Sequence, residues 1–234
     1  MRVAVLIFAS AALLLAACSK SEAPTPQAAP APASDVQGQK ELDLYRKLQL
    51  EKSYELAAPI GKEIVAKYPQ SAAAKEVQVT LADASAKADA ITTQRRLERL
   101  WSYQSGKESG GEQNTASIYS KDAVVADRIR LVLRRHSAWG QSVYLFGNGK
   151  GFECAGGCNL NIHFDEQAAK RMKAYLPETG EPALFISDDK AFIERLDAAQ
   201  TVSIDVTEKG KGARTLVFEV GGFDATKFPL VKKK

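Results

Sequence analysis

The sequence predicts an α+β fold, in which an N-terminal helical hairpin is followed by a mainly antiparallel β domain with two helices. Apolar residues recur at spacings of three and four between about residues 37 and 104, as in amphipathic helices. Later segments alternate apolar and polar residues, which is the period of half-buried strands. Most connections between these later segments are short, and short connections favour antiparallel pairing.

The first residues have the features of an export signal. Arg2 precedes an apolar run from Val3 to Leu15 that is too short to span a membrane. The quartet Leu15-Ala16-Ala17-Cys18 resembles the bacterial lipobox, in which the cysteine is lipidated after cleavage. This resemblance implies a lipoprotein signal peptide over residues 1–17 and acyl chains such as palmitate on Cys18, which anchor the protein to a membrane.

The residues after Cys18 bear on which membrane holds the anchor. In the enterobacterial sorting rule an aspartate at the next position retains a lipoprotein at the inner membrane, so Ser19 favours the outer membrane. Lys20 and Ser21 resemble an inner-membrane retention signal described for pseudomonads, which keeps the inner membrane as the alternative. In both cases the folded part lies in the periplasm.

A tether and a helical region follow. Residues 18–36 are rich in proline and alanine, cannot bury enough surface to offset their chain entropy, and are expected to be disordered. Residues 37–104 are predicted to be helical. The segment KSYELAAPIGKEIVAKYPQSAAAKEV resembles the second half of a tetratricopeptide repeat, through Tyr54, Ala57 and Tyr68-Pro69. Pro59 departs from that pattern because an interior proline kinks a helix, and a generic helical hairpin is the alternative.

The third helix of this region carries an apolar seam at heptad spacing, which can pack on the hairpin or pair with a partner chain. The seam consists of Val77, Leu81, Ala84, Ala88 and Ile91.

The rest of the chain is predicted to form the β domain. Residues 105–117, SGKESGGEQNTAS, are glycine-rich and polar and are predicted to be a loop. The α+β domain is expected over residues 118–228, with a basic tail over 229–234. Helices are predicted at Glu166 to Leu176, before Pro177, and in DDKAFIERLDAAQ. Strands are predicted in DRIRLVLRRH, QSVYLFG, NLNIHFD, LFIS, TVSIDV and ARTLVFEV.

Two cysteines remain once Cys18 is acylated. Cys154 and Cys158 would face an oxidising periplasm, where thiols pair, so a disulfide is predicted. Closing so small a ring stabilises the fold by about 2 kcal/mol in the chain-entropy model. A redox pair is an alternative, although such pairs are usually spaced C-x-x-C at a helix start. A zinc site with His136 and His163 is another, and unpaired thiols are a third.

The sequence contains no motif for the catalytic arrangements that can be recognised from spacing. There is no G-x-S-x-G elbow, no H-E-x-x-H pair and no Walker loop. The glycine-rich run Gly147 to Gly151 is predicted to be a turn, and Asp188 and Asp189 are predicted to cap a helix. We therefore expect no enzymatic activity, no cofactor and no metal.

Charge points to one candidate surface. The formal net charge of +4 does not suggest a nucleic-acid partner. Arg128, Arg130 and Arg134 share one face of a predicted strand, with Arg135 beside them. They form either a solvated face or a docking surface for an acidic partner, which could be an envelope protein, a peptidoglycan carboxylate or a lipid phosphate.

The order of elements from Arg128 to Phe223 resembles the C-terminal region of the VasI/TagO-like proteins associated with type VI secretion. The likeness is carried by IRLVLR, by the cysteine-bearing turn before NIHFD, by ALFISDDKAFIERLDAAQTVSIDV and by TLVFEVGGFD. It implies an envelope accessory without an agreed enzymatic site, covers under half of the chain and transfers no functional residue to these positions.

Together these features predict a membrane-anchored periplasmic lipoprotein that acts as a scaffold or secretion accessory. One alternative is a periplasmic immunity protein or enzyme inhibitor, which needs the same anchoring. Another is a metal-binding or hydrolytic domain.

Overall fold

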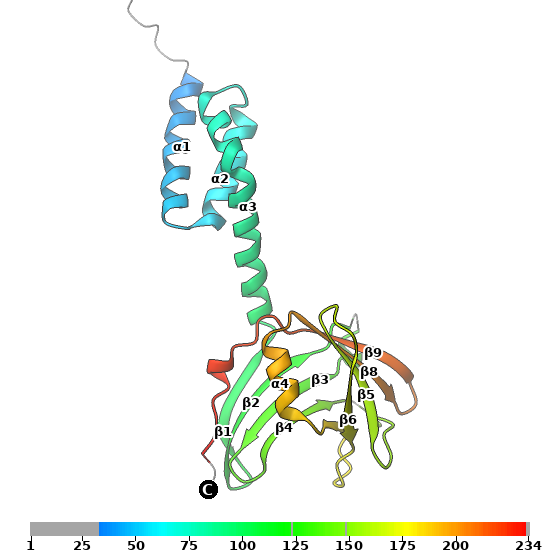
Figure 1. The fold of residues 1–234 in the computed structure, drawn as a ribbon. Helices are drawn as coiled ribbons and strands as arrows, with labels where there is room; N and C mark the ends of the chain where they lie inside the picture. The colour runs from blue at the N-terminus through cyan, green and yellow to red at the C-terminus, as the bar shows by residue number, and fades with distance from the viewer. Residues whose placement is uncertain (1–32, 123, 148, 233–234) are drawn as a thin grey trace, which may run out of the picture.

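The α+β fold class is confirmed by a computed structural model that describes residues 33–122, 124–147 and 149–232. Three helices come first and a nine-stranded antiparallel sheet follows (Figure 1). The predicted signal peptide, Cys18, most of the predicted tether and the last two lysines lie outside the described residues. No helix in the described ranges is long and apolar enough to cross a membrane.

The three N-terminal helices form a small bundle with its own core. They are α1 (Ala33–Leu50), α2 (Tyr54–Lys67) and α3 (Ala72–Glu98), so the end of the predicted tether is already helical. Gly61 permits their close approach, because a Cβ there would lie 2.8 Å from both Tyr45 and Leu81. The buried core consists of Leu42, Tyr45, Leu48, Ala57, Ile64, Ala73, Ala74 and Val77.

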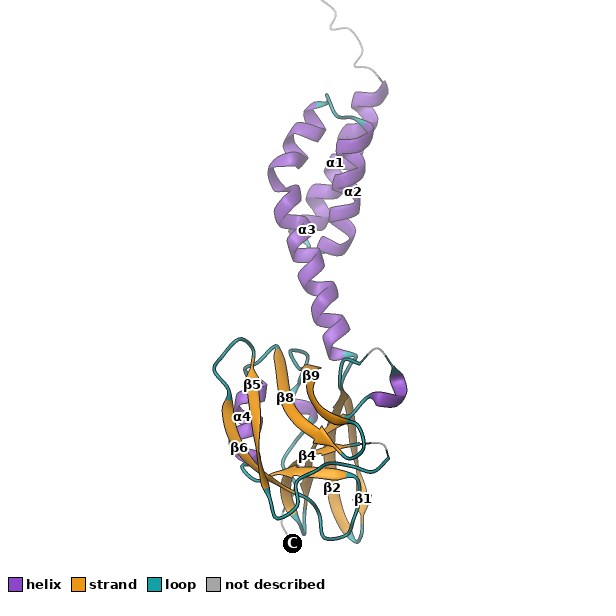
Figure 2. Cartoon of the chain, turned by 90° about the vertical axis from the view of Figure 1, so that its right-hand side faces the viewer, coloured by secondary structure: helices purple, strands orange, loops and turns teal. Residues whose placement is uncertain are grey.

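The predicted heptad seam of α3 packs on the hairpin rather than facing outward. Val77 and Ala84 are fully buried, and Ala88 is nearly so. Beyond Ala88, Glu55 at the start of α2 binds Thr92 and Arg95, and α3 then continues alone to the sheet (Figures 1 and 2). We call residues 89–98 of α3, which join the buried part of the bundle to the sheet, the stalk. At 1.5 Å per residue the 27 residues of α3 span about 40 Å.

The sheet curves strongly around a single core (Figure 2). Its spatial order is β1-β2-β3-β4-β7-β6-β5-β8-β9. The elements are β1 (Ser102–Glu108), β2 (Gly111–Tyr119), β3 (Arg130–His136), β4 (Gly140–Phe146), β5 (Cys158–Phe164), β6 (Lys170–Tyr175), β7 (Ala183–Ile186), α4 (Asp189–Asp197), β8 (Thr201–Glu208) and β9 (Gly212–Glu219), with short 3-10 turns at Val125–Asp127 and Ala225–Lys227.

The glycine-rich segment 105–117 is a β hairpin, not the predicted loop. β1 and β2 pair in register up to Glu108 and Gly111, and the turn uses positive φ at Ser109 and Gly110. The pattern was hard to read because β1 is an edge strand whose side chains are mostly exposed. In β2, Ala116 and Ile118 supply the buried positions.

The helix predicted at Glu166 to Leu176 is also wrong, because this segment contains β6. Its composition favours a helix, yet pairing with β5 and β7 overrides that local preference. Met172 and Ala174 point into the core, while Lys173 and Tyr175 point outward. Among its described residues the β domain therefore contains one α-helix, α4, rather than two.

Helix α4 and the end of α3 complete the fold. Asp188 caps α4 as predicted by accepting the Ala191 N–H at 3.2 Å, and Phe192 is fully buried in the core. At the other junction the Trp101 indole N–H donates to the Val220 carbonyl at 3.2 Å. A Cβ on Gly222 would lie 2.2 Å from the Leu97 backbone, so α3 sits directly on the end of the sheet.

Candidate functional site

The outer face of the sheet carries a row of aromatic side chains that crosses three strands. Tyr144 on β4 pairs with Phe185 on β7, which pairs with Tyr175 on β6. The ring centroids are 4.8 and 5.4 Å apart, and the rings are stacked with interplanar angles of 27° and 21°. Stacked rings cover one another's faces, so the row presents ring edges outward. We call these three residues the aromatic row.

Two arginines of β3 lie beside this row on the same outer face. The Arg130 guanidinium lies 5.5 Å from the Phe146 ring centroid. The Arg134 guanidinium lies 5.4 Å from Tyr144 and 5.1 Å from Trp139, whose side chain is 52% exposed. Within the described residues, neither arginine has a carboxylate within 4.0 Å. The two side chains are therefore held by aromatic contacts with their charge unmatched by an acid.

The other two arginines of the predicted patch do not belong to this face. Arg128 lies before β3 and its Nε donates to the Asp122 carbonyl at 3.2 Å. Arg135 points to the opposite side of β3, where its guanidinium binds the Phe228 carbonyl, lies 4.2 Å from the Phe228 ring and donates to Gln141 at 3.1 Å. Burial lowers the pKa of Arg135. The prediction that the four arginines form one surface is wrong. Arg135 faces the opposite side because consecutive strand residues alternate, and Arg128 precedes the strand and binds the Asp122 carbonyl.

Strand β6 adds two cations that the sequence prediction missed. Arg171 and Lys173 are exposed, and they share the outer face with Tyr175. Neither forms an ion pair within the described residues. The signal for a strand here is the alternation of Met172 and Ala174 with their charged neighbours. It was missed because the segment was predicted to be a helix.

A polar row runs beside the aromatic row, one step along the strands. Arg134 pairs with Ser142, and its Nε donates to the Ser142 hydroxyl at 3.1 Å. Ser187 follows β7 and its N–H donates to the Lys173 carbonyl at 2.9 Å. Because Val143 pairs with Ile186, the register places Ser142 next to Ser187. Two small hydroxyl residues thus separate one cation on β3 from another on β6.

We call this surface the basic aromatic face. It consists of Arg130, Arg134, Ser142, Tyr144, Phe146, Arg171, Lys173, Tyr175, Phe185 and Ser187. Burial raises the pKa of Tyr144, so its hydroxyl keeps its proton at neutral pH and can donate to an anion. Tyr175 is 48% exposed at the far end of the row.

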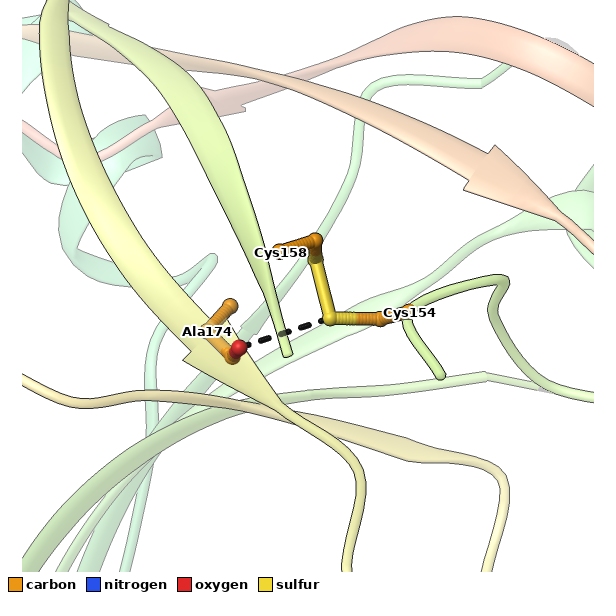
Figure 3. The surroundings of a disulfide bond; sticks show 3 residues. All are labelled: Cys154, Cys158 and Ala174. Atoms are coloured by element: carbon orange, nitrogen blue, oxygen red, sulfur yellow. Dashed lines mark hydrogen bonds between the residues drawn. A yellow bond between two sulfur atoms is a disulfide. The ribbon is translucent and has the colours of Figure 1, made fainter. Parts of the chain in front are cut away.

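The cysteine pair supports the same end of the sheet. The structure joins Cys154 to Cys158 by a disulfide with a Cα–Cα distance of 5.2 Å, and the Cys154 sulfur lies 3.4 Å from the Ala174 carbonyl oxygen (Figure 3). Gly156 and Gly157 adopt positive φ inside the small ring, as a turn this tight requires. Cys158 pairs with Ala174, the neighbour of Tyr175, so the bridge fixes the turn beside the aromatic row.

The zinc alternative has no support in this arrangement. Disulfide-bonded sulfurs are not thiolate ligands. His136 is buried; its Nδ1 accepts the N–H groups of Ala138 and Trp139, and its Nε2 lies 2.9 Å from the Glu108 carbonyl. Nδ1 therefore holds backbone groups of the β3–β4 turn, and Nε2 contacts the end of β1. Among the described residues no group of three or more His, Cys, Asp or Glu is placed to bind a metal.

A second surface feature is a polar groove on the exposed side of β5. Asn159 and Asn161 line a cavity of about 490 Å³ together with Asp205, Thr207 and Thr215. The Thr215 hydroxyl already donates to Asp205 at 2.7 Å. His163 is not among the lining residues, and its Nδ1 lies 3.2 Å from the Gln167 carbonyl. The groove holds no cluster of unmatched charge comparable with the basic aromatic face.

Comparison with known proteins adds little. No family model matches the chain, and no curated protein matches it. Among solved structures, a crystal structure of invasion associated protein B from Bartonella henselae is similar, with 18% identity over 54% of this chain and 87% of that chain and a TM-score of 0.38. A similarity at this level does not support a conclusion about function.

Proposed function

We propose that this chain is a lipid-anchored periplasmic protein that acts as an interaction or scaffold component of the cell envelope. The observation that carries the proposal is the basic aromatic face, where Arg130 and Arg134 lie beside stacked aromatic side chains and form no ion pair within the part of the chain that the structure describes. Tyrosine, tryptophan and arginine are the residues that dominate binding energy at protein interfaces, because they bury a large area and also form hydrogen bonds. The proposal includes no catalytic step.

The remaining features agree with an anchored adaptor. Acylation of Cys18 would fix the N-terminus to a membrane, with Ser19 favouring the outer one. α1 starts only 15 residues after Cys18, since Ala33 is its first residue. Helix α3, about 40 Å long, would then carry the β domain away from the bilayer. A disulfide at Cys154 and Cys158 suits an oxidising compartment.

Fractionation and crosslinking test the proposal. The chain should be found in the membrane fraction in lipidated form, and Cys18→Ser should release it from that fraction. In-cell crosslinking of the anchored chain should capture a protein partner, and Arg130→Gln with Arg134→Gln should reduce that capture. The matched control is Lys75→Gln with Lys209→Gln, which removes the same charge from exposed positions off the face.

Three results would overturn it. Finding unlipidated full-length chain in the cytosol would contradict both the lipid anchor and the periplasmic location. Equal capture of the partner by both double variants would show that the basic aromatic face does not take part in the interaction. A tight one-to-one complex with a single toxic enzyme would replace the scaffold with the inhibitor alternative.

A further inference from the structure

We infer that the basic aromatic face binds an extended acidic segment of a partner protein, which crosses strands β3, β4, β7 and β6 with one carboxylate at Arg134 and another at Lys173. The inference rests on the proposed function, since it names the chemistry of the partner that the scaffold would hold. It follows from the two cations, the floor between them and the aromatic row beside them.

The distance between the two cations fits an extended chain. β3 and β6 are three strand spacings apart in the sheet order, and each spacing is about 4.8 Å, so the backbones that carry the two cations lie about 14 Å apart across the sheet. An extended segment advances about 3.3 Å per residue. Two acidic residues about four positions apart would therefore reach both cations at once.

The floor of the polar row suits a backbone that lies across it. Ser142 and Ser187 have short side chains, so a chain can approach the sheet between Arg134 and Lys173. Their hydroxyls can each donate to a carbonyl of the segment. The two acids at the start of α4, Asp188 and Asp189, accept from the Ala191 N–H and from Gln141, and within the described residues neither forms an ion pair with Arg134 or Lys173.

The aromatic row adds to the preference for an anion. The edge of an aromatic ring carries partial positive charge and its face carries negative charge. Tyr144, Phe185 and Tyr175 turn their edges outward because their faces are stacked on one another. Ring edges and cations on this face therefore favour the same sign of ligand charge, while apolar side chains of the segment can pack along the row.

Three other kinds of occupant fit less well. Nucleobases bind by stacking on exposed ring faces, and the faces inside this row are covered. Sugar rings need the same exposed faces. A membrane surface is attracted by dense clusters of four to eight basic residues, whereas these cations are spread around an aromatic centre. The acidic peptide is the occupant that uses both rows.

The experiment measures binding of a fluorescein-labelled peptide to the purified full mature chain. The peptide carries two glutamates about four residues apart in a leucine- and serine-containing segment, and its control replaces both glutamates by glutamine. We expect the glutamate peptide to bind at least ten-fold more tightly than its control. Arg134→Gln with Lys173→Gln should weaken binding about ten-fold, which corresponds to about 1.4 kcal/mol, while Lys75→Gln with Lys209→Gln should leave it unchanged.

The outcomes separate this inference from the proposed function. Equal binding of the two peptides, or binding that survives Arg134→Gln with Lys173→Gln, would overturn the inference even if crosslinking still captures a partner. Phosphatidylglycerol vesicles or soluble peptidoglycan fragments that bind in place of the peptide, and depend on these two residues, would also overturn it. Far-ultraviolet circular dichroism and thermal melting of each variant show that a loss of binding is not a loss of fold.

Discussion

Arginines on the inner and outer sides of the sheet have different kinds of partner. On the inner side Arg135 binds the Phe228 carbonyl, and Arg214 binds Asp122 at 3.0 Å, Glu208 and the Asp127 carbonyl. On the outer side Arg130 and Arg134 contact rings and meet no carboxylate within the described ranges. Neighbours such as Arg134 and Arg135 thus have different roles because the pleat sends them to opposite sides. Basic residues alone do not mark a docking surface.

The largest difference between the two sides should appear in stability. Phe192→Ala removes a fully buried ring from the core and should lower the free energy of unfolding by about 3–5 kcal/mol. Phe185→Ala on the outer face should cost less than about 1.5 kcal/mol, because part of that ring is already exposed. Urea denaturation of both variants measures the two losses. Equal losses would mean that the aromatic row is part of the core rather than a surface.

The disulfide should contribute the next largest effect. Replacing Cys154 and Cys158 by serine should lower the free energy of unfolding by about 2 kcal/mol, through the greater freedom of the unfolded chain. Hydrogen exchange should become faster around β5 and β6 and stay unchanged in β2 and β3. Uniform acceleration across the sheet would show that the bridge does not act locally on the support of Tyr175.

A matched pair of arginine variants compares the two sides directly. Arg135→Gln should lower the free energy of unfolding by about 1–2 kcal/mol, because it removes a charged hydrogen bond and a cation–π contact at Phe228. Arg134→Gln should change stability by no more than about 0.5 kcal/mol and should instead weaken the acidic peptide. Thermal melting and peptide binding of the two proteins give the test. The comparison fails if both variants lose stability and keep binding.

The smallest expected effect concerns Glu219, an acidic residue on the outer face that forms an ion pair. Glu219 accepts from Arg96 of α3 at 2.9 and 3.1 Å, and this bond holds the pKa of Glu219 below its ordinary value of 4.5. The pair therefore adds stability above the unfolded-state pKa, and the contribution disappears as the pH falls through the lower folded-state pKa. Since the pair is partly exposed, it should be worth less than about 1 kcal/mol.

The test compares wild type with Glu219→Gln. The difference in their free energies of unfolding should be constant at neutral pH, should begin to shrink near the unfolded-state pKa of about 4.3, and should disappear as the pH falls through the lower folded-state pKa. A difference that persists in acid would show that Glu219 contributes through packing rather than through its charge.

Local patterns in the sequence were enough to predict several elements and not others. The bundle helices, the Asp188 cap and the alternation in β3 follow from neighbours within a few residues, so spacing revealed them. β6 and the β1–β2 hairpin could not be read this way, because their strand character depends on pairing with distant segments.

The candidate site shows the same limit. Arg130 and Arg134 were predicted on one face and lie there. The aromatic row joins β4, β7 and β6, and the pairing of β4 with β7 brings together strands that β5 and β6 separate in the sequence. Without that order, Tyr144, Phe185 and Tyr175 read as three unrelated aromatic residues. Lys173 was missed because its segment was assigned to a helix.

The stalk has a consequence for geometry. It is a single helix, and its end is locked to the sheet by Trp101 and by the close contact between Gly222 and Leu97. Each residue added to or removed from such a helix turns everything beyond it by about 100° and shifts it by about 1.5 Å. The number of residues between Ala88 and Leu97 therefore sets the rotational orientation of the β domain relative to the bundle.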